Sequence, residues 1–451
     1  MNRLSKIEQP KIEQSKIEPG LVRAEGFERC RILFADQLNL ARGKYVPMSE
    51  AAKGHARMCV GTFAVTYDKA LVAAPGGGLL TGLPDMEVTF DPADLRPSWE
   101  PNTQIALGAL RFQGEPFALC GRSALARAIE AWRARGLDPM VGIEMEAYVF
   151  QRGADGSWVP YDTPGAFVYG TGPFADPAGL IEEVWAMAAA CGIPIESINA
   201  EYDAPQFELT LRYADAMKAA DDAFLFRQMA REVLYKRGYL LSFLPKPFAE
   251  KSGSGLHFNL SFTQGDGSNA FANDVASGTL SDTMKGAIAG MLRHHEALSA
   301  IMAPLTQSYA RLQPASLSGY WANWGIDHRS VTVRVSAETG PAARIEHRLA
   351  DCAASPYFAM AALLQAGLLG LENGYELPPE EVNDGLETIN TDRHTPHDLG
   401  TALDALEADT VLSGAIGQVL IDNFIAIKRE EVRILEGKSA EEQLAYYLHY
   451  I

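Results

Sequence analysis

Charged side chains recur at every second position in several short segments of this sequence, the spacing that places residues on one face of a β-strand. In residues 256–262, His257, Asn259 and Ser261 alternate with apolar residues. One wet face of an antiparallel sheet would explain any single segment of this kind. Taken together, however, the polar positions hold Glu, His and Arg and no Lys, which favours a shared site. The other segments contribute Glu144 and Glu146, Glu208, and Arg344, Glu346 and Arg348.

If these segments line one cavity, its acidic side chains repel one another unless divalent cations lie among them. Oxygen-rich ligation with one imidazole suits Mg²⁺ or Mn²⁺ better than zinc. The sequence therefore predicts a site for hard cations. Its candidate ligands are Glu144, Glu146, Glu201, Glu208, Glu346 and His257.

Arginines accompany these acids and would hold anionic substrate and phosphate groups bidentately. Carboxylates, hard cations and arginines together indicate phosphoryl chemistry. The sequence contains neither a Gly-x-x-x-x-Gly-Lys-Ser/Thr loop nor a Gly-x-Gly-x-x-Gly that opens a helix after a strand. Nucleotide binding must therefore depend on metals and arginines. The candidate arginines are Arg311, Arg329, Arg334, Arg344 and Arg348.

The composition narrows the class of protein. The 451 residues carry 39 Lys and Arg against 57 Asp and Glu, a net charge of −18. A surface this acidic repels phosphate backbones and anionic lipid, so nucleic acid and membranes are poor partners. No apolar run reaches the ~18 residues of a membrane span, and no export signal is visible. Five scattered cysteines without a Cys-x-x-Cys motif favour reduced thiols in the cytoplasm.

The order of expected elements predicts an α+β fold. Residues 1–24 contain a five-residue Lys-Ile-Glu repeat, interrupted by proline, and are expected to form a flexible extension. Short strands and glycine turns predict a small domain over residues 25–115. Isolated strands and helices predict a large domain over residues 116–451, without the regular alternation of a doubly wound sheet.

Three helices are expected from apolar periodicity. The first would be capped by Ser123 and stopped by Gly136, with Leu125 and Trp132 on its apolar side. The second would begin at residues 176–177 and end at Gly192. The third would cover residues 214–237.

The motifs that carry the acids resemble those of the glutamine synthetase family. Residues 246–248 and 253–261 resemble its ATP-binding signature, and residues 142–146 and 200–208 resemble its metal-binding strands. Segments resembling the family's later motifs follow in order at residues 308–312, 327–330, 344–348 and 355–357. Residues 373–380 resemble the loop that holds an adenylylated tyrosine in some bacterial members, which would correspond to Tyr375. The resemblance runs from about residue 28 to the C-terminus.

This resemblance implies a β-grasp-like N-terminal domain and a large catalytic domain with a curved antiparallel sheet surrounded by helices. It implies ATP-dependent ligation of an amine to the γ-carboxylate of glutamate through a γ-glutamyl phosphate. It also implies an oligomer of two stacked rings, with active sites at subunit boundaries.

The resemblance also assigns roles to individual positions. Glu146, Glu201 and Glu208 resemble ligands of the metal near glutamate, and Glu144, His257 and Glu346 resemble ligands of the metal bridging the ATP phosphates. Gly253, Arg311 and Arg348 resemble the glutamate-holding positions. Arg329 resembles the arginine that stabilises the transferring phosphoryl group, and Ser261, Arg334 and Arg344 resemble nucleotide contacts.

Three positions depart from the family pattern. Leu317 stands where a flap glutamate accepts a proton from ammonium, unless the flap has drifted by a residue or two. The aspartate that a neighbouring subunit supplies has no clear equivalent in residues 60–63. Ser252 replaces the asparagine that precedes the glycine of the glutamate-binding loop.

These departures favour an organic amine over ammonium as the acceptor. Leucine in place of a carboxylate would leave ammonium desolvated and unpaired, whereas an alkyl or aryl amine gains from apolar contact. Tyr320, Trp321 and Trp324 could extend that apolar wall, although core packing explains each of them more simply. The alternatives are a true glutamine synthetase and a catalytically silent member with a structural role. The retained charges argue against silence.

Overall fold

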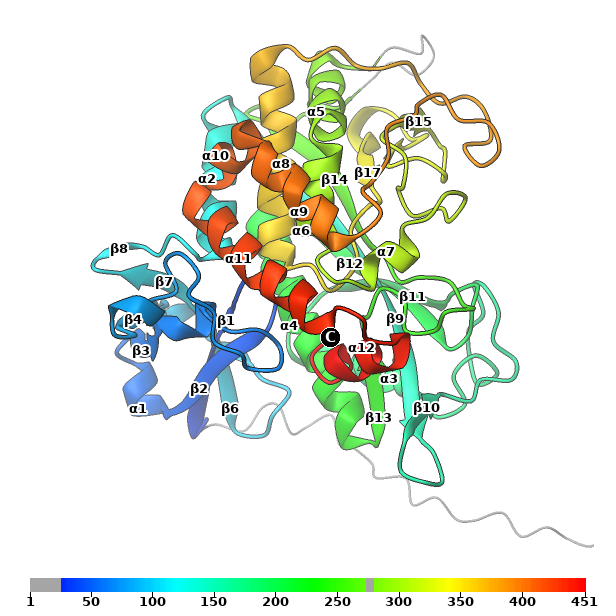
Figure 1. Ribbon diagram of the computed structural model, residues 1–451. Coiled ribbons are helices and arrows are strands. Elements are labelled where there is room, and N and C mark those ends of the chain that lie inside the picture. Colours follow the sequence, from blue (N-terminus) through cyan, green and yellow to red (C-terminus); the bar gives the residue numbers. More distant parts are fainter. Residues whose placement is uncertain (1–25, 273–279) are drawn as a thin grey trace, which may run out of the picture.

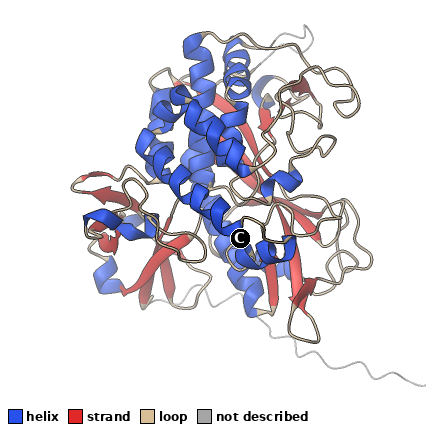
Figure 2. Cartoon of the chain, in the orientation of Figure 1, coloured by secondary structure: helices blue, strands red, loops and turns tan. Residues whose placement is uncertain are grey.

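The computed structural model describes residues 26–272 and 280–451. The predicted flexible extension lies outside these residues. The predicted α+β class is confirmed: a small N-terminal sheet domain precedes a large sheet-rich domain surrounded by helices (Figures 1 and 2). The limits of 25–115 and 116–451 remain predictions.

The N-terminal part contains two four-stranded sheets, in the orders β2-β1-β6-β5 and β3-β4-β7-β8. Cys30, Ile32 and Phe34 on β1 are buried in a core separate from that of the large domain. The elements are β1 (Arg29–Ala35), β2 (Ala41–Pro47), α1 (Met48–Ala51), β3 (His55–Cys59), η1 (Val60–Phe63), η2 (Leu79–Thr81), β4 (Asp85–Thr89), η3 (Pro92–Asp94), β5 (Arg96–Pro97), β6 (Thr103–Leu107), β7 (Ala109–Phe112) and β8 (Glu115–Pro116).

The large domain is built on one nine-stranded sheet. Its main path is β11-β12-β9-β14-β17-β16-β15, and β10 and β13 also pair with β9. All of these pairs are antiparallel except β15 with β16. The strands are β9 (Leu137–Arg152), β10 (Trp158–Pro160), β11 (Ile195–Ala200), β12 (Gln206–Asp215), β13 (Tyr239–Ser242), β14 (Leu256–Gln264), β15 (Trp324–Ile326), β16 (Val333–Val335) and β17 (Ile345–His347).

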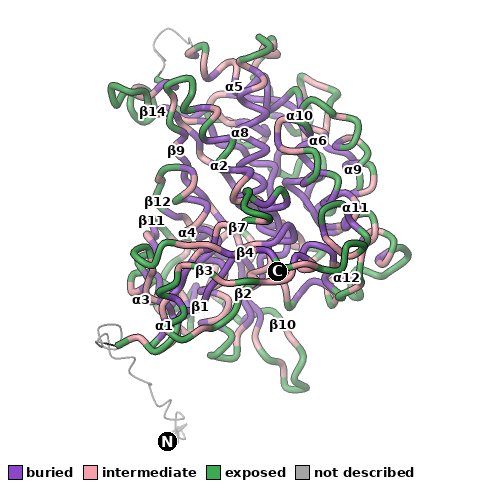
Figure 3. Tube along the Cα trace, turned by 90° about the vertical axis from the view of Figure 1, so that its left-hand side faces the viewer, coloured by how far each residue is buried: buried purple, intermediate pink, exposed green. Residues whose placement is uncertain are grey.

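Helices surround this sheet, and Figure 3 shows buried, purple trace along several of them. They are α2 (Gly121–Arg133), α3 (Leu180–Ala190), α4 (Ala216–Lys236), α5 (Asp282–Arg293), α6 (His295–Met302), α7 (Ser308–Arg311), η5 (Gly340–Ala342), α8 (Pro356–Asn373), α9 (Leu399–Ala408), α10 (Thr410–Ile416), α11 (Gln418–Leu435) and α12 (Ala440–Tyr447).

The predicted alternation in β14 sorts its side chains onto two faces. Leu256, Phe258, Leu260 and Phe262 are each at most 3% exposed and pack into the main core. Trp132 of α2 stacks on Phe262 with ring centroids 4.0 Å apart. Its indole nitrogen donates to the Leu364 carbonyl of α8 at 2.9 Å, which joins two helices to the apolar face. The opposite face is left for polar side chains.

Close helix packing behind the sheet depends on glycine. A Cβ atom on Gly290 of α5 would lie 2.0 Å from the Ala366 carbonyl oxygen of α8, and one on Gly370 of α8 would lie 2.0 Å from the Gly286 carbonyl oxygen. Because no side chain fits at these points, the two backbones pack directly against each other.

Two of the three expected helices differ at their ends. The first begins at Gly121, with Cys120 rather than Ser123 at the N-cap, and ends at Arg133. The second begins at Leu180, because Gly179 adopts a left-handed φ of 68° that a helix cannot include. Asp176 still stabilises the first turn of this helix, because its Oδ2 accepts a hydrogen bond from the Ile181 amide at 2.8 Å. The third helix agrees with the prediction within two residues.

Within the described ranges, no single helix has both the length and the apolar character needed to cross a membrane. Helices α10 and α11 reach these values only as a pair, with a bend of 110° between them.

The apolar face of β14 is expected to contribute strongly to stability. Phe258 is fully buried and lies opposite Ile143 and His347 on the neighbouring strands. Phe258→Ala should lower the free energy of unfolding by about 3–5 kcal/mol, through lost burial and the cavity left behind. Tyr235→Ala, at a ring that is 53% exposed, is the control and should cost less than half as much. Urea denaturation of both variants measures this, and equal losses would contradict it.

Candidate active site

The polar face of the large sheet carries predicted site residues in three cross-strand rows. Successive rows lie two residues apart along β9 and β14, so their side chains project from the same face. The pairing therefore unites segments separated by up to 200 residues of sequence. Read across the sheet, the rows are Arg334–Glu346–Asn259, His257–Glu144 and Glu146–Glu208.

The structure brings the six predicted metal ligands together in two groups. Within each group, one possible ligand atom per residue lies within 4.8 Å of the others. The imidazole of His257 lies between the groups, with Nδ1 3.2 Å from a Glu144 oxygen and Nε2 3.9 Å from a Glu146 oxygen. The groups are Glu144, His257 and Glu346, and Glu146, Glu201 and Glu208.

Burial and mutual repulsion raise the pKa of some of these acids, whereas hydrogen bonds lower that of another. Burial, reinforced by the surrounding carboxylates, raises the pKa of Glu208 to about 8 and also raises that of Glu201. Burial likewise disfavours the ionised form of Glu144. Hydrogen bonds from His257 and from Asn259, the latter at 2.8 Å, outweigh it and lower the pKa of Glu144 to about 2.

This donor set fits hard divalent cations. Glu146 and Glu208 are paired directly across two antiparallel strands, where like charges destabilise a sheet. Cations among the carboxylates would convert that repulsion into attraction and could neutralise charge on phosphate. Five carboxylates with one imidazole match Mg²⁺ or Mn²⁺ rather than a sulfur-rich or histidine-rich metal site. Their role as ligands remains a prediction.

Neighbouring polar groups orient Glu146. Its Oε2 accepts from the Gly255 amide at 2.7 Å. Gln206, two residues before Glu208 on β12, donates to the Gly253 carbonyl at 2.9 Å and to the Ser254 hydroxyl at 3.0 Å. These bonds fasten the loop before β14 to the sheet. Sequence reasoning missed Gln206, although its two-residue spacing from Glu208 was a usable signal.

Two of the predicted arginines bind the same carboxylate. Arg334 donates to Glu346 Oε2 at 3.1 Å, and Arg348 donates to Glu346 Oε1. The second guanidinium nitrogen of Arg348 donates to the Leu317 carbonyl at 3.2 Å. Arg348 therefore connects the polar face of the sheet to residues 314–319, the segment that contains Leu317 and is expected to form the flap.

Arg311 lies buried against the predicted glutamate loop. It donates to the carbonyls of Leu349 and Arg348 at 2.8 and 3.1 Å, and burial lowers its pKa. A Cβ atom on Gly253 would lie 2.5 Å from Arg311 Cγ, so only glycine allows this approach. Ser252, the unexpected residue beside that glycine, donates its backbone amide and its hydroxyl to Asp203 at 2.5 and 2.7 Å.

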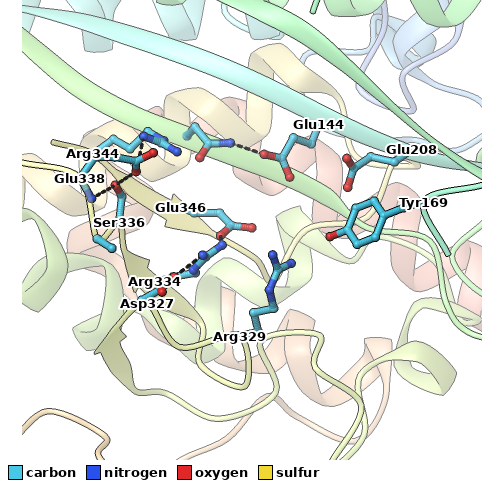
Figure 4. Close-up of a pocket in the computed structure, with 12 residues that line it drawn as sticks. Glu144, Tyr169, Glu208, Asp327, Arg329, Arg334, Ser336, Glu338, Arg344 and Glu346 are labelled. Atoms are coloured by element: carbon cyan, nitrogen blue, oxygen red, sulfur yellow. Dashed lines mark hydrogen bonds and ion pairs between the residues drawn. The ribbon is translucent and has the colours of Figure 1, made fainter. Parts of the chain in front are cut away.

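A cavity of about 360 Å³ opens over the first metal group (Figure 4). Arg329, Arg334 and Arg344 line it together with Glu144, Glu208 and Glu346. Figure 4 shows the Arg329 guanidinium directed toward the space between Glu346 and Tyr169. A cavity of about 880 Å³ shares several of these residues and contains Ser261.

The structure thus divides the predicted residues into an open and a buried set. Arg329, Arg334, Arg344 and Ser261 line the two cavities. Gly253, Arg311 and Arg348 do not line either cavity, and Arg311 and Arg348 are only 5% and 7% exposed. Their contacts are with protein backbone and with Glu346.

Sequence reasoning missed three further residues of the smaller cavity. Asp327 pairs with Arg334, and Glu338 accepts from Arg344 at 2.9 Å. Each carboxylate therefore partly neutralises the positive charge of an arginine that is expected to face phosphate. Tyr169 reaches the cavity from a loop, because its amide donates to the Ala200 carbonyl at 2.8 Å. No periodic pattern surrounds Tyr169, so the sequence offered no signal for it.

The flap carries Leu317 in an unusual conformation. Leu317 has a φ of 55° and is 47% exposed, and its carbonyl is the group held by Arg348. The aromatic residues that follow do not line the smaller cavity. Tyr320 and Trp324 are 6% and 7% exposed and belong to the main core, and Trp321 packs against it. Core packing is therefore the correct reading of these three aromatic residues.

Comparison with known proteins bears on this arrangement directly. Residues 118–447 match the family model described as glutamine synthetase, catalytic domain. The chain belongs to the glutamine synthetase family. It is 32% identical over 436 residues to a glutamine synthetase of Pyrococcus abyssi, with 92% of each chain covered.

Solved structures of the family superpose on most of the chain. A novel glutamine synthase homolog has a TM-score of 0.82 at 25% identity, covering 95% of this chain and 100% of its own. GmaS without ligand has a TM-score of 0.80 at 28% identity, covering 95% and 98%. Members of the glutamine synthetase family are carbon–nitrogen ligases that use ATP and divalent metal ions and are typically oligomeric.

The two acidic groups should each hold a cation. Wild-type protein should bind two Mn²⁺ ions per chain in equilibrium dialysis, and Glu146→Ala should remove one of them. Chelation should abolish ATP turnover, and Glu146→Ala should slow it by at least about 10²-fold, as other losses of electrostatic stabilisation do. Glu441→Gln, at an exposed residue of α12, is the control and should bind metal and turn over ATP like the wild-type protein. Full turnover in Glu146→Ala would refute the assignment.

Substitutions of the exposed Arg329 and the buried Arg311 should change different kinetic constants. Arg329→Ala should lower kcat by about 10²-fold with little change in the glutamate KM, if Arg329 acts on the transition state. Arg311→Lys should mainly raise the glutamate KM. Lysine is preferable to alanine at this position because Arg311 also donates hydrogen bonds to the backbone carbonyls of Arg348 and Leu349, which follow β17. Steady-state kinetics with varied glutamate separates the two. The same defect in both variants would show that the roles are wrong.

Proposed function

We propose that this protein is an ATP-dependent glutamate–amine ligase that joins the γ-carboxylate of L-glutamate to an organic primary amine. A carboxylate oxygen of glutamate attacks the γ-phosphorus of ATP and ADP leaves, which forms γ-glutamyl phosphate. The amine nitrogen then attacks the acyl carbon, and phosphate leaves as the amine loses a proton. The products are a γ-glutamylamide, ADP and phosphate.

The observation that carries this proposal is the absence of acidic residues from the flap. Residues 314–319 hold Ser316, Leu317 and Ser318 among proline, alanine and glycine, and none of them is acidic. An ammonium ion needs anionic or hydrogen-bonding partners when it leaves water, and leucine supplies neither. An amine with an alkyl or aryl body can instead bury apolar surface against Leu317, at about 25 cal/mol per Å² before ordering costs.

The remaining site residues have distinct roles in this proposal. Glu146, Glu201 and Glu208 would hold the cation near glutamate, and Glu144, His257 and Glu346 the cation on the ATP phosphates. These cations would neutralise phosphate charge. Gly253, Arg311 and Arg348 would shape the glutamate site, Ser261, Arg334 and Arg344 would contact the nucleotide, and Arg329 would stabilise the transferring phosphoryl group.

Structural similarity to GmaS, a γ-glutamylmethylamide synthetase, supports an amine acceptor. The second candidate is a true glutamine synthetase, which is favoured by the names of the sequence relatives. A catalytically silent member is disfavoured, because a site without function has no reason to keep five mutually repelling carboxylates. We further propose a cytoplasmic homo-oligomer of stacked rings, with active sites at subunit boundaries.

Leu317 should decide the choice of acceptor. Wild-type kcat/KM should be higher for primary alkyl or aryl amines than for ammonium. Leu317→Glu should raise kcat/KM for ammonium by about tenfold or more, the factor that about 1.4 kcal/mol of charge-assisted hydrogen bonding supplies. It should weaken use of the bulkier amine. Phosphate release with a panel of amines measures both effects.

Leu317→Gln is the matched control, because it replaces leucine with a polar side chain of the same length as glutamate but without its charge. It should weaken binding of the organic amine, and it should raise kcat/KM for ammonium less than Leu317→Glu does, because its amide oxygen accepts a hydrogen bond but carries no charge. A wild-type enzyme that prefers ammonium over every organic amine tested would contradict the proposal and identify a glutamine synthetase instead.

A further inference from the structure

One segment at the β15 edge of the large sheet is fastened to the loop that carries Arg329. Residues 378–390, here called the strap, follow α8 and pass beside β15, as the orange trace in Figure 1 shows. The amide of Glu381 donates to the Trp324 carbonyl at 2.8 Å, and the Ile326 amide donates to the Glu380 carboxylate at 3.1 Å. The strap therefore binds along the strand that leads directly into residues 327–330.

A buried carboxylate organises the strap. Glu381 is 1% exposed, and its two oxygens accept from groups on both sides. Oε1 accepts from the backbone and side-chain nitrogens of Asn383, both at 2.9 Å. Oε2 accepts from the Asn390 amide at 2.7 Å and from the Asn323 side chain at 3.5 Å. Glu381 thus joins the two ends of the strap to each other and to the start of β15.

His328, the residue before Arg329, links the loop to the strap. The Ser330 amide donates to His328 Nδ1 at 3.2 Å, so Nδ1 carries a lone pair. The proton of the neutral ring must then reside on Nε2, which donates to the Asn383 carbonyl at 2.7 Å. One imidazole therefore fixes the backbone on both sides of Arg329 relative to Glu381.

Packing reinforces these hydrogen bonds. Gly385 of the strap is buried, with a φ of 65°, and a Cβ atom there would lie 2.8 Å from Ser330 Cβ and 3.1 Å from His328 Cε1. The strap backbone thus lies directly on the loop. Arg329 itself is exposed, and without such support its long side chain would have many conformations to choose from.

We propose that Glu381 and His328 are positioning residues for phosphoryl transfer, which hold the Arg329 loop through the strap. This inference rests on the proposed function, because it takes Arg329 as the arginine that acts on the transferring phosphoryl group. A misplacement of about 1 Å in such a group costs up to about 10²-fold in rate. The strap is therefore part of the active site although none of its residues lines the 360 Å³ cavity.

Three substitutions of His328 test the link. His328→Ala removes both hydrogen bonds, His328→Asn retains an acceptor near the Nδ1 position, and His328→Gln retains a donor near the Nε2 position. His328→Ala and His328→Asn should lower kcat about 10- to 100-fold with little change in the KM values for glutamate and ATP, and His328→Gln should restore most of the loss. Equal activity in the Gln and Asn variants would overturn the proposal. Val382→Ala, at a side chain that is 78% exposed on the strap, should match wild type.

A double-mutant cycle shows whether the effect passes through Arg329. If it does, His328→Ala should lower kcat less than about twofold in an Arg329→Ala background, because the group being positioned is already gone. The same should hold for Glu381→Gln. Full additivity of the two losses would overturn the proposal.

Hydrogen exchange gives a readout that needs no substrate. In full-length protein, His328→Ala should increase exchange at the amides of residues 326–330 and 381–390, while the strands of the large sheet stay protected. Unchanged exchange at both segments would overturn the proposal whatever the activity. A protein that ligates neither ammonium nor any amine but shows this local increase would refute the proposed function and leave the strap contact intact.

Discussion

The crowding of five carboxylates and one imidazole at one face of the large sheet is the constraint on which the site depends. Four of the carboxylates lie on strands, and Glu201 follows β11 directly. The register pairs Glu146 with Glu208 and Glu144 with His257, so these groups cannot move apart without breaking the sheet. Burial and mutual repulsion raise the pKa of Glu208 to about 8. Divalent cations would relieve this repulsion, and the same cations could neutralise the phosphate charge that ATP brings. In this account, the crowding of carboxylates favours binding of metal and nucleotide.

The packing and the hydrogen bonds around this face hold its side chains in place. The buried face of β14 and the close α5–α8 packing fix the sheet from behind. Arg348 connects Glu346 to the Leu317 carbonyl, so the segment proposed to meet the acceptor is tied to the carboxylates that would bind metal. Arg329, by contrast, lies on an exposed loop, and in our proposal Glu381 and His328 support that loop. The strands thus carry the carboxylates, and supported loops carry the residues proposed to select the acceptor and to act on phosphate.

The sequence was most informative where the chemistry lies on regular strands. A period of two placed His257, Asn259 and Ser261 on one face of β14 without any structure. The family motifs sorted five glutamates and His257 into two groups that the structure brings together. Helix ends were less predictable, because Gly179 and Cys120 act through backbone conformation that composition does not reveal. The roles of Tyr169 and the strap could not be predicted from the sequence for a different reason. Both contact the site through loops, and the path of a loop leaves no periodic pattern in the sequence.

The route of one oxygen atom tests the central proposal most directly. The enzyme would be given glutamate labelled with ¹⁸O in its γ-carboxylate, together with ATP, Mg²⁺ and either an organic primary amine or ammonium. If the carboxylate attacks ATP and the amine then displaces phosphate, each γ-glutamylamide formed leaves one ¹⁸O atom in phosphate, and the organic amine gives the higher kcat/KM. Unlabelled phosphate would contradict the γ-glutamyl phosphate route. Labelled phosphate with ammonium as the preferred acceptor would keep that route and contradict the assignment of an organic amine.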